Sequence, residues 1–247
     1  MDILIASFSK YNAVLTTCLN EFDKLNPNLN FRIITDSNLN FLPKKINCQI
    51  TYLEKDQGWL KSILALLDDY DEDEQIILCM DDLLPKYFIG NEVLDAFIRL
   101  SKKEDFDSLK LYEPPSQRIS SSIRSNFSEV RSCKNDRYPI STMFSIFKVS
   151  FLKEHLLGSS DAWDFEQNAI TRIKDSSKCF SSPFNIIDFS NIVIKGSIVQ
   201  KRLDENYLKT FVLKNMSKFD LIRHYLTIIF STMKSFSFRS FLRFLFH

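Results

Sequence analysis

The sequence predicts an α/β fold in which a mixed, mainly parallel sheet is flanked by helices. Strand-like and helix-like patterns alternate along the chain. One apolar run, Gln75–Cys79, has the length and β-branched content of a strand that is covered on both faces. The chain has 247 residues, 45% of them hydrophobic and 26% charged, which is enough for one large domain with a sizeable core.

The expected elements follow from the spacing of apolar residues. Strands are expected at residues 2–8, 31–36, 50–53, 75–79, 108–112, 140–149, 186–189 and 192–194, and helices at 13–25, 59–67, 91–102 and 151–157. The polar stretch Ser116–Arg137 is either a functional loop or a plain surface excursion. The acidic run Asp68–Glu74 is interpreted as a solvated turn rather than a metal site.

Composition argues against several classes of protein. The net charge of +1 gives no reason to expect nucleic acid as a partner. Glycine occurs only 4 times, and neither G-x-G-x-x-G nor G-x-x-x-x-G-K is present, which argues against dinucleotide oxidoreductases and P-loop enzymes. The 5 cysteines are widely spaced without a C-x-x-C pair, which favours a reducing cytoplasm over a disulfide framework or a zinc site. The opening Met1–Ala6 is expected to be a strand rather than a signal peptide, and no apolar run is long enough for a membrane-spanning helix.

Two adjacent carboxylates, Asp81 and Asp82, follow the apolar run directly. Buried carboxylates are costly unless they are paired or bind a metal, and ligands of open α/β sheets bind beyond the carboxyl ends of strands. The pair could therefore hold a divalent cation, and through it a diphosphate. The alternative is that both residues simply begin a turn before Pro85.

A second acidic cluster contains Asp161, Asp164 and Glu166. Asp161 and Asp164 both fit the first turn of a helix, where they would cap it, whereas Glu166 is less easily explained as a cap. An inverting sugar transfer needs a carboxylate that takes a proton from the acceptor hydroxyl. Trp163 is either a core residue or a platform under an acceptor sugar.

Four local features, in this order along the chain, resemble the GT-A glycosyltransferases, particularly small bacterial enzymes that assemble surface polysaccharides such as O-antigen, capsule or lipooligosaccharide. The resemblance covers about residues 1–200. Its features are Ser7-Phe8-Ser9-Lys10-Tyr11 after the first strand, Asp36 at the end of the second, Met80-Asp81-Asp82, and Trp163-Asp164-Phe165-Glu166.

The resemblance implies a GT-A-like, Rossmann-type catalytic domain over residues 1–205. Its donor would be a nucleotide-diphosphate sugar and its acceptor a saccharide on a lipid carrier; an oligomer is compatible with this. The residues implied on the donor side are Ser7, Lys10, Tyr11, Asp36, Gly58, Trp59, Ser62, Asp81 and Lys195.

The resemblance also implies a divalent cation, Mn²⁺ or Mg²⁺, with Asp82 as the first ligand and Asp81 as the second or as a contact to the ribose or sugar. Glu166 would be the acceptor-side base, with Asp164 and Asp161 as competitors, and Trp163 would line the acceptor site. The chain departs from the family pattern because its two aspartates are adjacent and no D-x-D is present. Neighbouring strand residues point to opposite faces, so both can reach one ligand only if the strand has already ended.

Two other functions stay open from the sequence. A sugar nucleotidyltransferase can share the sheet and the metal aspartates, but it usually has a Gly-rich basic loop after the first strand, and Ser7-Phe8-Ser9-Lys10 is not such a loop. A non-catalytic, membrane-associated scaffold would have no need of acidic residues at strand ends.

Residues 206–247 are predicted to form a helical, amphipathic tail. From Leu221 onward this tail has no acidic residue, while Arg223, Lys234, Arg239 and Arg243 are interspersed with large apolar and aromatic side chains. Such a segment is typical of a helix that lies on an anionic lipid surface. We therefore expect a cytoplasmic protein on the inner face of the cell membrane, the alternative being a helix that packs on the main domain or in a dimer.

A chain that ends near Lys218 should stay folded, bind the nucleotide donor and lose activity mainly on lipid-linked acceptors. The four basic residues of the tail would contribute roughly 4 kcal/mol of attraction to an anionic surface before salt screens it. Co-sedimentation with anionic liposomes at low and high salt measures this attraction. A full-length protein that ignores anionic vesicles at low salt would show that the tail packs on protein instead.

Overall fold

The computed structural model describes residues 1–26, 28–39, 42–112, 122–124, 129–191, 193–194 and 197–198. The chain divides into two compact units, Met1–Ser190 and Asn191–His247. In the second unit, β12 (Val193–Ile194) pairs antiparallel with β13 (Ser197–Ile198). Lys195 and the predicted tail 206–247 lie outside the described residues.

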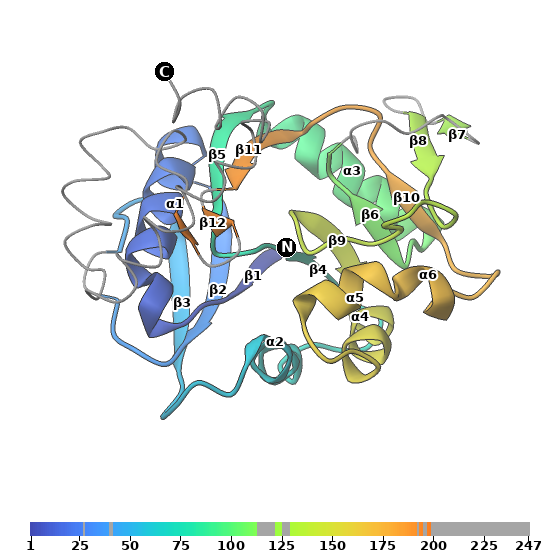
Figure 1. Ribbon diagram of the computed structural model, residues 1–247. Coiled ribbons are helices and arrows are strands. Elements are labelled where there is room, and N and C mark those ends of the chain that lie inside the picture. Colours follow the sequence, from blue (N-terminus) through green and yellow to red (C-terminus); the bar gives the residue numbers. More distant parts are fainter. Residues whose placement is uncertain are drawn as a thin grey trace, which may run out of the picture. The chain divides into compact units, whose positions relative to one another are not determined.

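The first unit is built on a nine-stranded mixed sheet with the order β3-β2-β1-β4-β9-β6-β10-β8-β7 (Figure 1). Strand β9 runs antiparallel to both of its neighbours, β4 and β6, and β8 runs antiparallel to β10 and β7. The other four neighbouring pairs are parallel, and all strands of the sheet except β8 and β9 run in the same direction, so the predicted mixed, mainly parallel sheet is confirmed. The strands are β1 (Asp2–Ala6), β2 (Asn30–Thr35), β3 (Asn47–Tyr52), β4 (Gln75–Leu78), β6 (Ser108–Lys110), β7 (Ser122–Arg124), β8 (Glu129–Ser132), β9 (Ser145–Lys148) and β10 (Cys179–Ser181).

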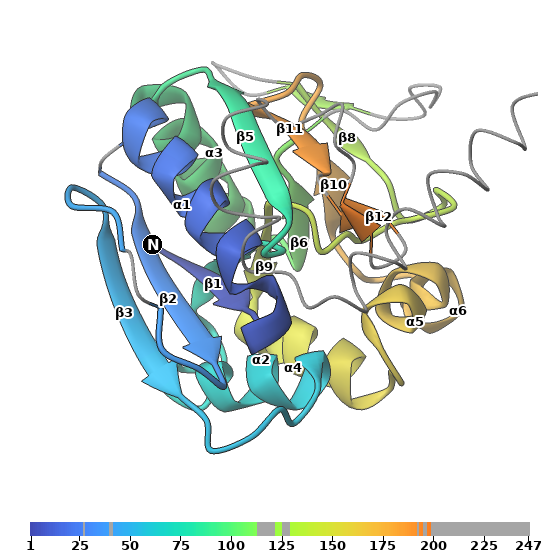
Figure 2. The ribbon, with the colours of Figure 1, turned by 60° about the vertical axis from the view of Figure 1, so that its left-hand side comes forward.

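Helices cover both faces of this sheet, as Figure 2 shows. On one face α1 (Asn12–Leu25) and α3 (Asn91–Glu104) supply buried side chains such as Phe22 and Phe97. On the other face lie α2 (Trp59–Leu67), α4 (Val149–Leu157), and the short helices α5 (Ala162–Gln167) and α6 (Ala169–Arg172). A 3₁₀ turn, η1 (Ser9–Tyr11), precedes α1.

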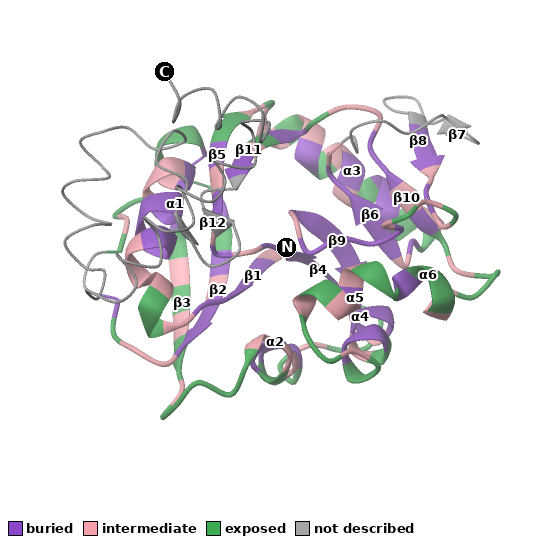
Figure 3. Ribbon diagram, in the orientation of Figure 1, coloured by how far each residue is buried: buried purple, intermediate pink, exposed green. Residues whose placement is uncertain are grey.

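Side chains alternate between the two faces of the central strands, so each strand contributes to both hydrophobic cores. In β1, Ile3 and Ile5 join the core under α1 and α3, whereas Leu4 and Ala6 join the core over α2 and α4. Every residue of β4 is buried, which agrees with the continuous apolar run in its sequence (Figure 3). Each such fully buried aliphatic side chain contributes roughly 1.5–3 kcal/mol of hydrophobic free energy.

Several strands were not predicted or begin elsewhere. Strand β5 (Leu83–Phe88) contains Pro85, and a proline is tolerated there because, within the described residues, β5 has one strand neighbour, β11 (Ile187–Asn191). Strands β7 and β8 lie inside the polar stretch that was expected to be a loop, and β10 is too short, at three residues, to leave a pattern. The strand expected at 140–149 begins only at Ser145, because the preceding residues turn away to bind a helix.

A buried ionic cluster anchors the chain between β8 and β9. The guanidinium of Arg131 donates to both carboxylate oxygens of Asp136, at 2.9 and 2.8 Å, and Lys110 Nζ lies 3.6 Å from Asp136 Oδ2. Lys110 Nζ also donates to the carbonyl of Tyr138 at 2.8 Å. Removing one member of a buried ion pair typically costs about 3–5 kcal/mol, so this cluster fixes the path of the segment that leads to β9.

No helix within the described residues has the length and apolar character needed to cross a membrane.

Candidate active site

The carboxyl edge of the sheet collects the polar residues that follow its strands. Strands β1, β2, β4 and β6 end at this edge, and β9 begins there, because β9 runs against β4 and β6. Backbone bonds extend the ladder slightly beyond the strands: Ser7 N donates to the carbonyl of Ile34, and Cys79 N to that of Leu4. The residues after β1, β2 and β4 and those before β9 therefore come together.

Asp81 is a buried carboxylate at the end of β4. It is 7% exposed, and Ser7 Oγ donates a hydrogen bond of 2.6 Å to its Oδ2. Burial raises the pKa of Asp81 to about 7; the bond from Ser7 opposes this shift and the charge of Asp82 adds to it. Burial also raises the pKa of Asp82, which is half-buried, to about 6. Both carboxylates are thus held in surroundings that disfavour their charge.

The strand has ended before these two residues. Strand β4 stops at Leu78, and Asp81 and Asp82 form a turn that leads into β5. The alternation that would send adjacent strand residues to opposite faces therefore does not apply to them. Asp81 and Asp82 can therefore belong to a turn and to a ligand site at once, since the turn occupies the place where a ligand of such a sheet binds.

The segment after β1 folds against the end of β2. Asp36 Oδ1 accepts a bond of 2.6 Å from the backbone N–H of Ser9. The next residue, Lys10, is exposed, with its Nζ 4.9 Å from the centre of the Tyr11 ring, and its charge helps to lower the pKa of Asp81. The structure thus brings together Ser7, Lys10, Tyr11, Asp36, Asp81 and Asp82 of the predicted donor-side residues.

Helix α2 begins on a glycine with a left-handed backbone. Gly58 has φ +83°, a conformation that favours glycine, and its N–H donates to Asp56 Oδ1 at 2.7 Å. The hydroxyl of Ser62 donates back to the carbonyl of Gly58 at 3.0 Å, so Ser62 acts inside the helix. Trp59 is half-buried, and its ring centre lies 6.0 Å from that of Phe165 on α5. Trp59 thus contacts α5, whereas the bonds of Gly58 and Ser62 lie at the start of α2 itself.

The acidic cluster on α5 divides into two kinds of residue. Asp161 Oδ1 accepts from the N–H of Asp164 at 2.8 Å, and Asp164 Oδ2 accepts from the N–H of Ser160 at 2.7 Å, which is reciprocal capping of the helix. The bond from Ser160 N–H, with further help from Asn168 and Arg172, lowers the pKa of Asp164 to about 2. Both residues therefore cap the helix, which is one of the two roles that the sequence left open for them.

Glu166 faces the other way, into the carboxyl edge. Its Oε1 accepts three hydrogen bonds, from Ser141 Oγ at 2.9 Å, Thr142 N at 2.6 Å and Thr142 Oγ1 at 2.8 Å. Trp163, three residues before Glu166 on the same helix, is 66% exposed and is not a core residue. It is open to solvent, as an acceptor platform needs to be.

Three residues of this edge carry no sequence motif: Tyr112, Ser141 and Thr142. Burial raises the pKa of the Tyr112 phenol, Ser141 opposes the shift, and the charge of Glu166 adds to it, so Tyr112 lies beside this pair. Ser141 and Thr142 were not predicted as site residues, because they were expected to belong to a strand at 140–149. The available signal was two hydroxyl side chains inside an otherwise apolar run.

The described residues contain no group of three or more His, Cys, Asp or Glu side chains that could hold a metal by themselves. They do fit a cation that arrives with a diphosphate. Mg²⁺ in such sites is held by one or two carboxylates, with substrate phosphates and water completing its shell. Asp82 and Asp81 supply the two carboxylates, and their raised pKa values are what a nearby cation would counteract.

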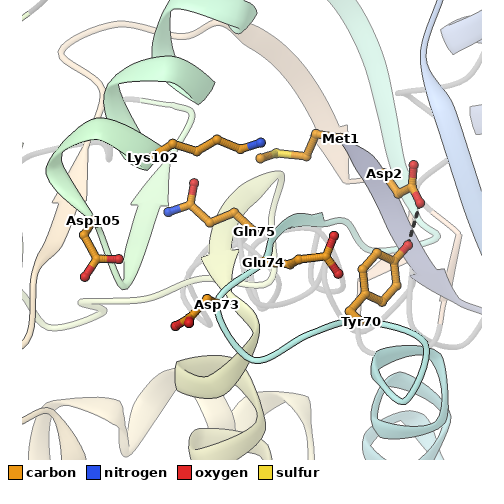
Figure 4. A pocket seen from close by; sticks show the side chains of 8 residues that line it. All are labelled: Met1, Asp2, Tyr70, Asp73, Glu74, Gln75, Lys102 and Asp105. Carbon is orange, nitrogen blue, oxygen red and sulfur yellow. Dashed lines mark hydrogen bonds between the residues drawn. The ribbon is translucent and has the colours of Figure 1, made fainter.

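A cavity of about 530 Å³ lies at the opposite, amino edge of the sheet, where β1 and β4 begin (Figure 4). Its carboxylates already have partners: Tyr70 Oη donates to Asp2 at 2.6 Å, and Lys148 pairs with Asp105 at 3.0 Å and with Asp73 at 3.3 Å. It is separate from the carboxylates that follow the strands. Its lining residues are Met1, Asp2, Tyr70, Asp73, Glu74, Gln75, Lys102 and Asp105.

By its fold and its site, the chain is an α/β protein that gathers acidic residues at the carboxyl edge of a mixed sheet. No protein-family model and no curated protein matches its sequence. Among solved structures it is similar to a 1–349 fragment of TarS from S. aureus, with 12% identity, a TM-score of 0.44, and coverage of 73% of this chain and 59% of that chain.

Two further solved structures are similar to this chain. The mannosyltransferase PcManGT from Pyrobaculum calidifontis, in complex with GDP-Man and Mn²⁺, has 10% identity, a TM-score of 0.48, and coverage of 79% of this chain and 57% of that one. A UDP-glucose pyrophosphorylase has 12% identity, a TM-score of 0.45, and coverage of 77% and 92%. The chain spans less than two thirds of the TarS fragment and of PcManGT. At these identities and TM-scores, a function has to be argued from the chain's own residues.

Replacing Asp81 by Asn should stabilise the ligand-free protein, and more so at higher pH. The folded state raises the pKa of Asp81 from 3.8 to about 7, so it binds more protons than the unfolded state between these values. Stability is therefore lost as the pH rises through this window, at up to about 1.4 kcal/mol per pH unit, and Asp81→Asn removes the loss.

Melting temperatures measured at pH 4.5 and pH 8, without divalent cations, check this expectation. The advantage of Asp81→Asn over the wild type should be larger at pH 8. Asp175→Asn is the control, because solvent surrounds this side chain and its replacement should leave the pH dependence unchanged. An Asp81→Asn advantage that is equal at both pH values would show that Asp81 is not buried as described.

Proposed function

We propose that the protein is a glycosyltransferase that moves a sugar from a nucleotide-diphosphate donor to a saccharide acceptor. One observation carries the proposal: a pair of carboxylates and a separate, hydrogen-bonded carboxylate lie on the same edge of one sheet. Asp81 and Asp82 follow β4, and Glu166 is bound to the residues that precede β9, which pairs with β4. An inverting, metal-assisted sugar transfer uses these two acidic functions side by side.

On the donor side, Asp82 and Asp81 would hold a divalent cation, Mn²⁺ or Mg²⁺. Such a cation supplies charge stabilisation to the departing diphosphate. Ser7 keeps Asp81 in place through its 2.6 Å bond. The exposed ammonium of Lys10 lies close enough to influence Asp81 and can offset phosphate charge as well.

On the acceptor side, Glu166 would act as the general base of a transfer that inverts the anomeric configuration. The acceptor oxygen attacks the anomeric carbon, the bond from that carbon to the diphosphate breaks, and the proton of the acceptor hydroxyl passes to Glu166. Trp163, exposed on the same helix, would stack under the acceptor sugar.

Two features of the site favour sugar transfer over nucleotidyl transfer. The nucleophile in nucleotidyl transfer is a sugar phosphate, which is already an anion and needs no base such as Glu166. The segment Ser9–Tyr11 after β1 is a 3₁₀ turn without glycine, whereas a pyrophosphate-binding loop relies on close backbone approach. A non-catalytic scaffold would gain nothing from burying Asp81 at the cost that its raised pKa indicates.

We further propose that the acceptor is carried on a lipid in bacterial surface-polysaccharide assembly. The support is the basic, aromatic composition of residues 221–247, which suits attachment to the inner face of the cell membrane. The protein would then work in the cytoplasm at the membrane surface.

Asp82→Asn should abolish sugar transfer and weaken Mn²⁺-dependent binding of nucleoside diphosphates, because it removes a charge that holds the cation. Asp81→Asn should weaken metal binding less. A thermal-shift panel of nucleoside diphosphates, with and without Mn²⁺, measures binding, and release of nucleoside diphosphate from sugar donors measures transfer.

Asp73→Asn is the matched control, since Asp73 is a carboxylate in the cavity at the opposite edge. It should change neither readout. Wild-type transfer rates in both the Asp82 and the Asp81 variants would rule out the strand-end site. Synthesis of a nucleotide sugar from a nucleoside triphosphate and a sugar 1-phosphate would establish the nucleotidyltransferase instead.

Glu166→Gln should lower kcat by about 10²–10⁴-fold, the usual loss for a positioned general base, while donor binding persists. Asp161→Ala should instead cost about 1 kcal/mol of stability, because it removes the N-cap of α5. Steady-state kinetics and melting temperatures separate the two effects. If Asp161→Ala or Asp164→Asn loses more activity than Glu166→Gln, the base is one of those residues.

A further inference from the structure

We infer that Ser141 and Thr142 are positioning residues that hold one oxygen of Glu166 and thereby aim its other oxygen at the acceptor hydroxyl. The assignment rests on the proposed function. It concerns two residues that no sequence motif marks and that do not themselves touch the reacting atoms.

The contact is one-sided. All three donors, the two hydroxyls and the N–H of Thr142, reach Oε1, at distances between 2.6 and 2.9 Å. Within the part of the chain that the structure describes, no donor reaches Oε2. A carboxylate that only anchored a helix would gain from bonds to both oxygens. Holding one oxygen and leaving the other open is the arrangement that a base requires.

The segment that holds Glu166, residues 141–145, is stabilised by hydrogen bonds of its own. Ser141 Oγ, which donates to Glu166, also accepts from the N–H of Met143 at 3.2 Å. Ser145 Oγ donates to the carbonyl of Met143 at 2.6 Å, and Leu111 N donates to the carbonyl of Phe144 at 3.3 Å. Both Ser141 and Thr142 are buried. The two hydroxyls therefore have fixed surroundings and little freedom to point elsewhere.

The chain that leads to this segment is fixed as well. Asp136 joins Arg131 and Lys110 in the buried ionic cluster, and Lys110 Nζ holds the carbonyl of Tyr138. Cys133 Sγ lies 3.1 Å from the carbonyl of Pro139. The path from β8 to Ser141 is thus bonded at successive points.

The helix that carries Glu166 is held from the opposite side. Phe165, with 0% exposure, packs its ring 6.0 Å from both Trp59 on α2 and Phe147 on β9. With the backbone of Glu166 set by Phe165 and its carboxylate set by Ser141 and Thr142, the remaining freedom is small. Misplacement of a catalytic group by about 1 Å can cost 10²-fold in rate, so such fixation has a direct catalytic value.

Thr142→Val, which keeps the shape of the side chain and removes its hydroxyl, tests the assignment in the full-length protein. It should lower kcat by about 10- to 100-fold, with the donor dissociation constant and the KM for the donor unchanged. Thr142→Ser, which keeps the hydroxyl, should recover most of the rate. Ser141→Ala should show a loss of the same kind as Thr142→Val.

A double-mutant cycle with Glu166→Gln distinguishes positioning from a merely structural role. If Thr142 acts through Glu166, adding Thr142→Val to Glu166→Gln should lower kcat no further. Equal losses from Thr142→Val in both backgrounds, or no recovery in Thr142→Ser, would overturn the assignment. Melting temperatures within the range of the wild type confirm that each variant is folded.

The cycle also separates the two levels of the proposal. Suppose that the wild type transfers sugar and that Glu166→Gln removes this activity, but that Thr142→Val does not lower it. In that case the positioning role alone is wrong. If the wild type releases no nucleoside diphosphate from any sugar donor, the proposed function is wrong and the positioning role is overturned with it.

Discussion

A carboxylate buried at the end of a central strand is the constraint on which the rest of this structure depends. Asp81 lies next to Asp82 in surroundings that raise the pKa of both, and the Ser7 hydroxyl donates a hydrogen bond to its carboxylate. Charge of one sign held in a poorly solvated place costs free energy until a cation offsets it. The proposed affinity of this site for a cation with a diphosphate would therefore have the same physical origin as the cost of the site without one.

The second half of the site is organised around the first by packing rather than by charge. Trp59 at the start of α2 and Phe165 on α5 are in ring contact, and Phe165 also meets Phe147 on the strand that pairs with β4. The carboxylate of Glu166 is then set by hydroxyl groups of the same β9 segment. The core that contains Phe147 and Phe165 thus fixes the position of Glu166 relative to β9 and, through β9, to β4.

Much of the fold could be predicted from the sequence, because β1, β2, β4 and the long helices are marked by apolar periodicity that tertiary contacts do not override. The placement of Asp81 and Asp82 after a buried strand could be predicted for the same reason. The short strands β8 and β10 could not, since their pairing is decided by partners distant in the sequence.

The roles within the acidic cluster of α5 needed coordinates. Asp161, Asp164 and Glu166 look alike along the chain, and only the direction of each side chain separates two helix caps from a carboxylate turned toward the sheet. Ser141 and Thr142 were hidden for a related reason: an apolar run with two hydroxyls resembles a strand until its hydrogen-bond partners are known.

The reversed direction of β9 has a consequence for how the molecule is made. Strands β1 to β4 all lie within residues 2–78. They pair in parallel with one another, in the order β3-β2-β1-β4. During synthesis this half can associate while β9, which begins at Ser145, has not yet left the ribosome. The exposed flank of β4 stays unpaired until β9 has been synthesised. Strand β6 precedes β9 in the chain, but it can join the sheet only after β9 has paired with β4. The nascent chain thus passes through a stage with an unpaired strand edge, and an unpaired edge favours aggregation with other chains.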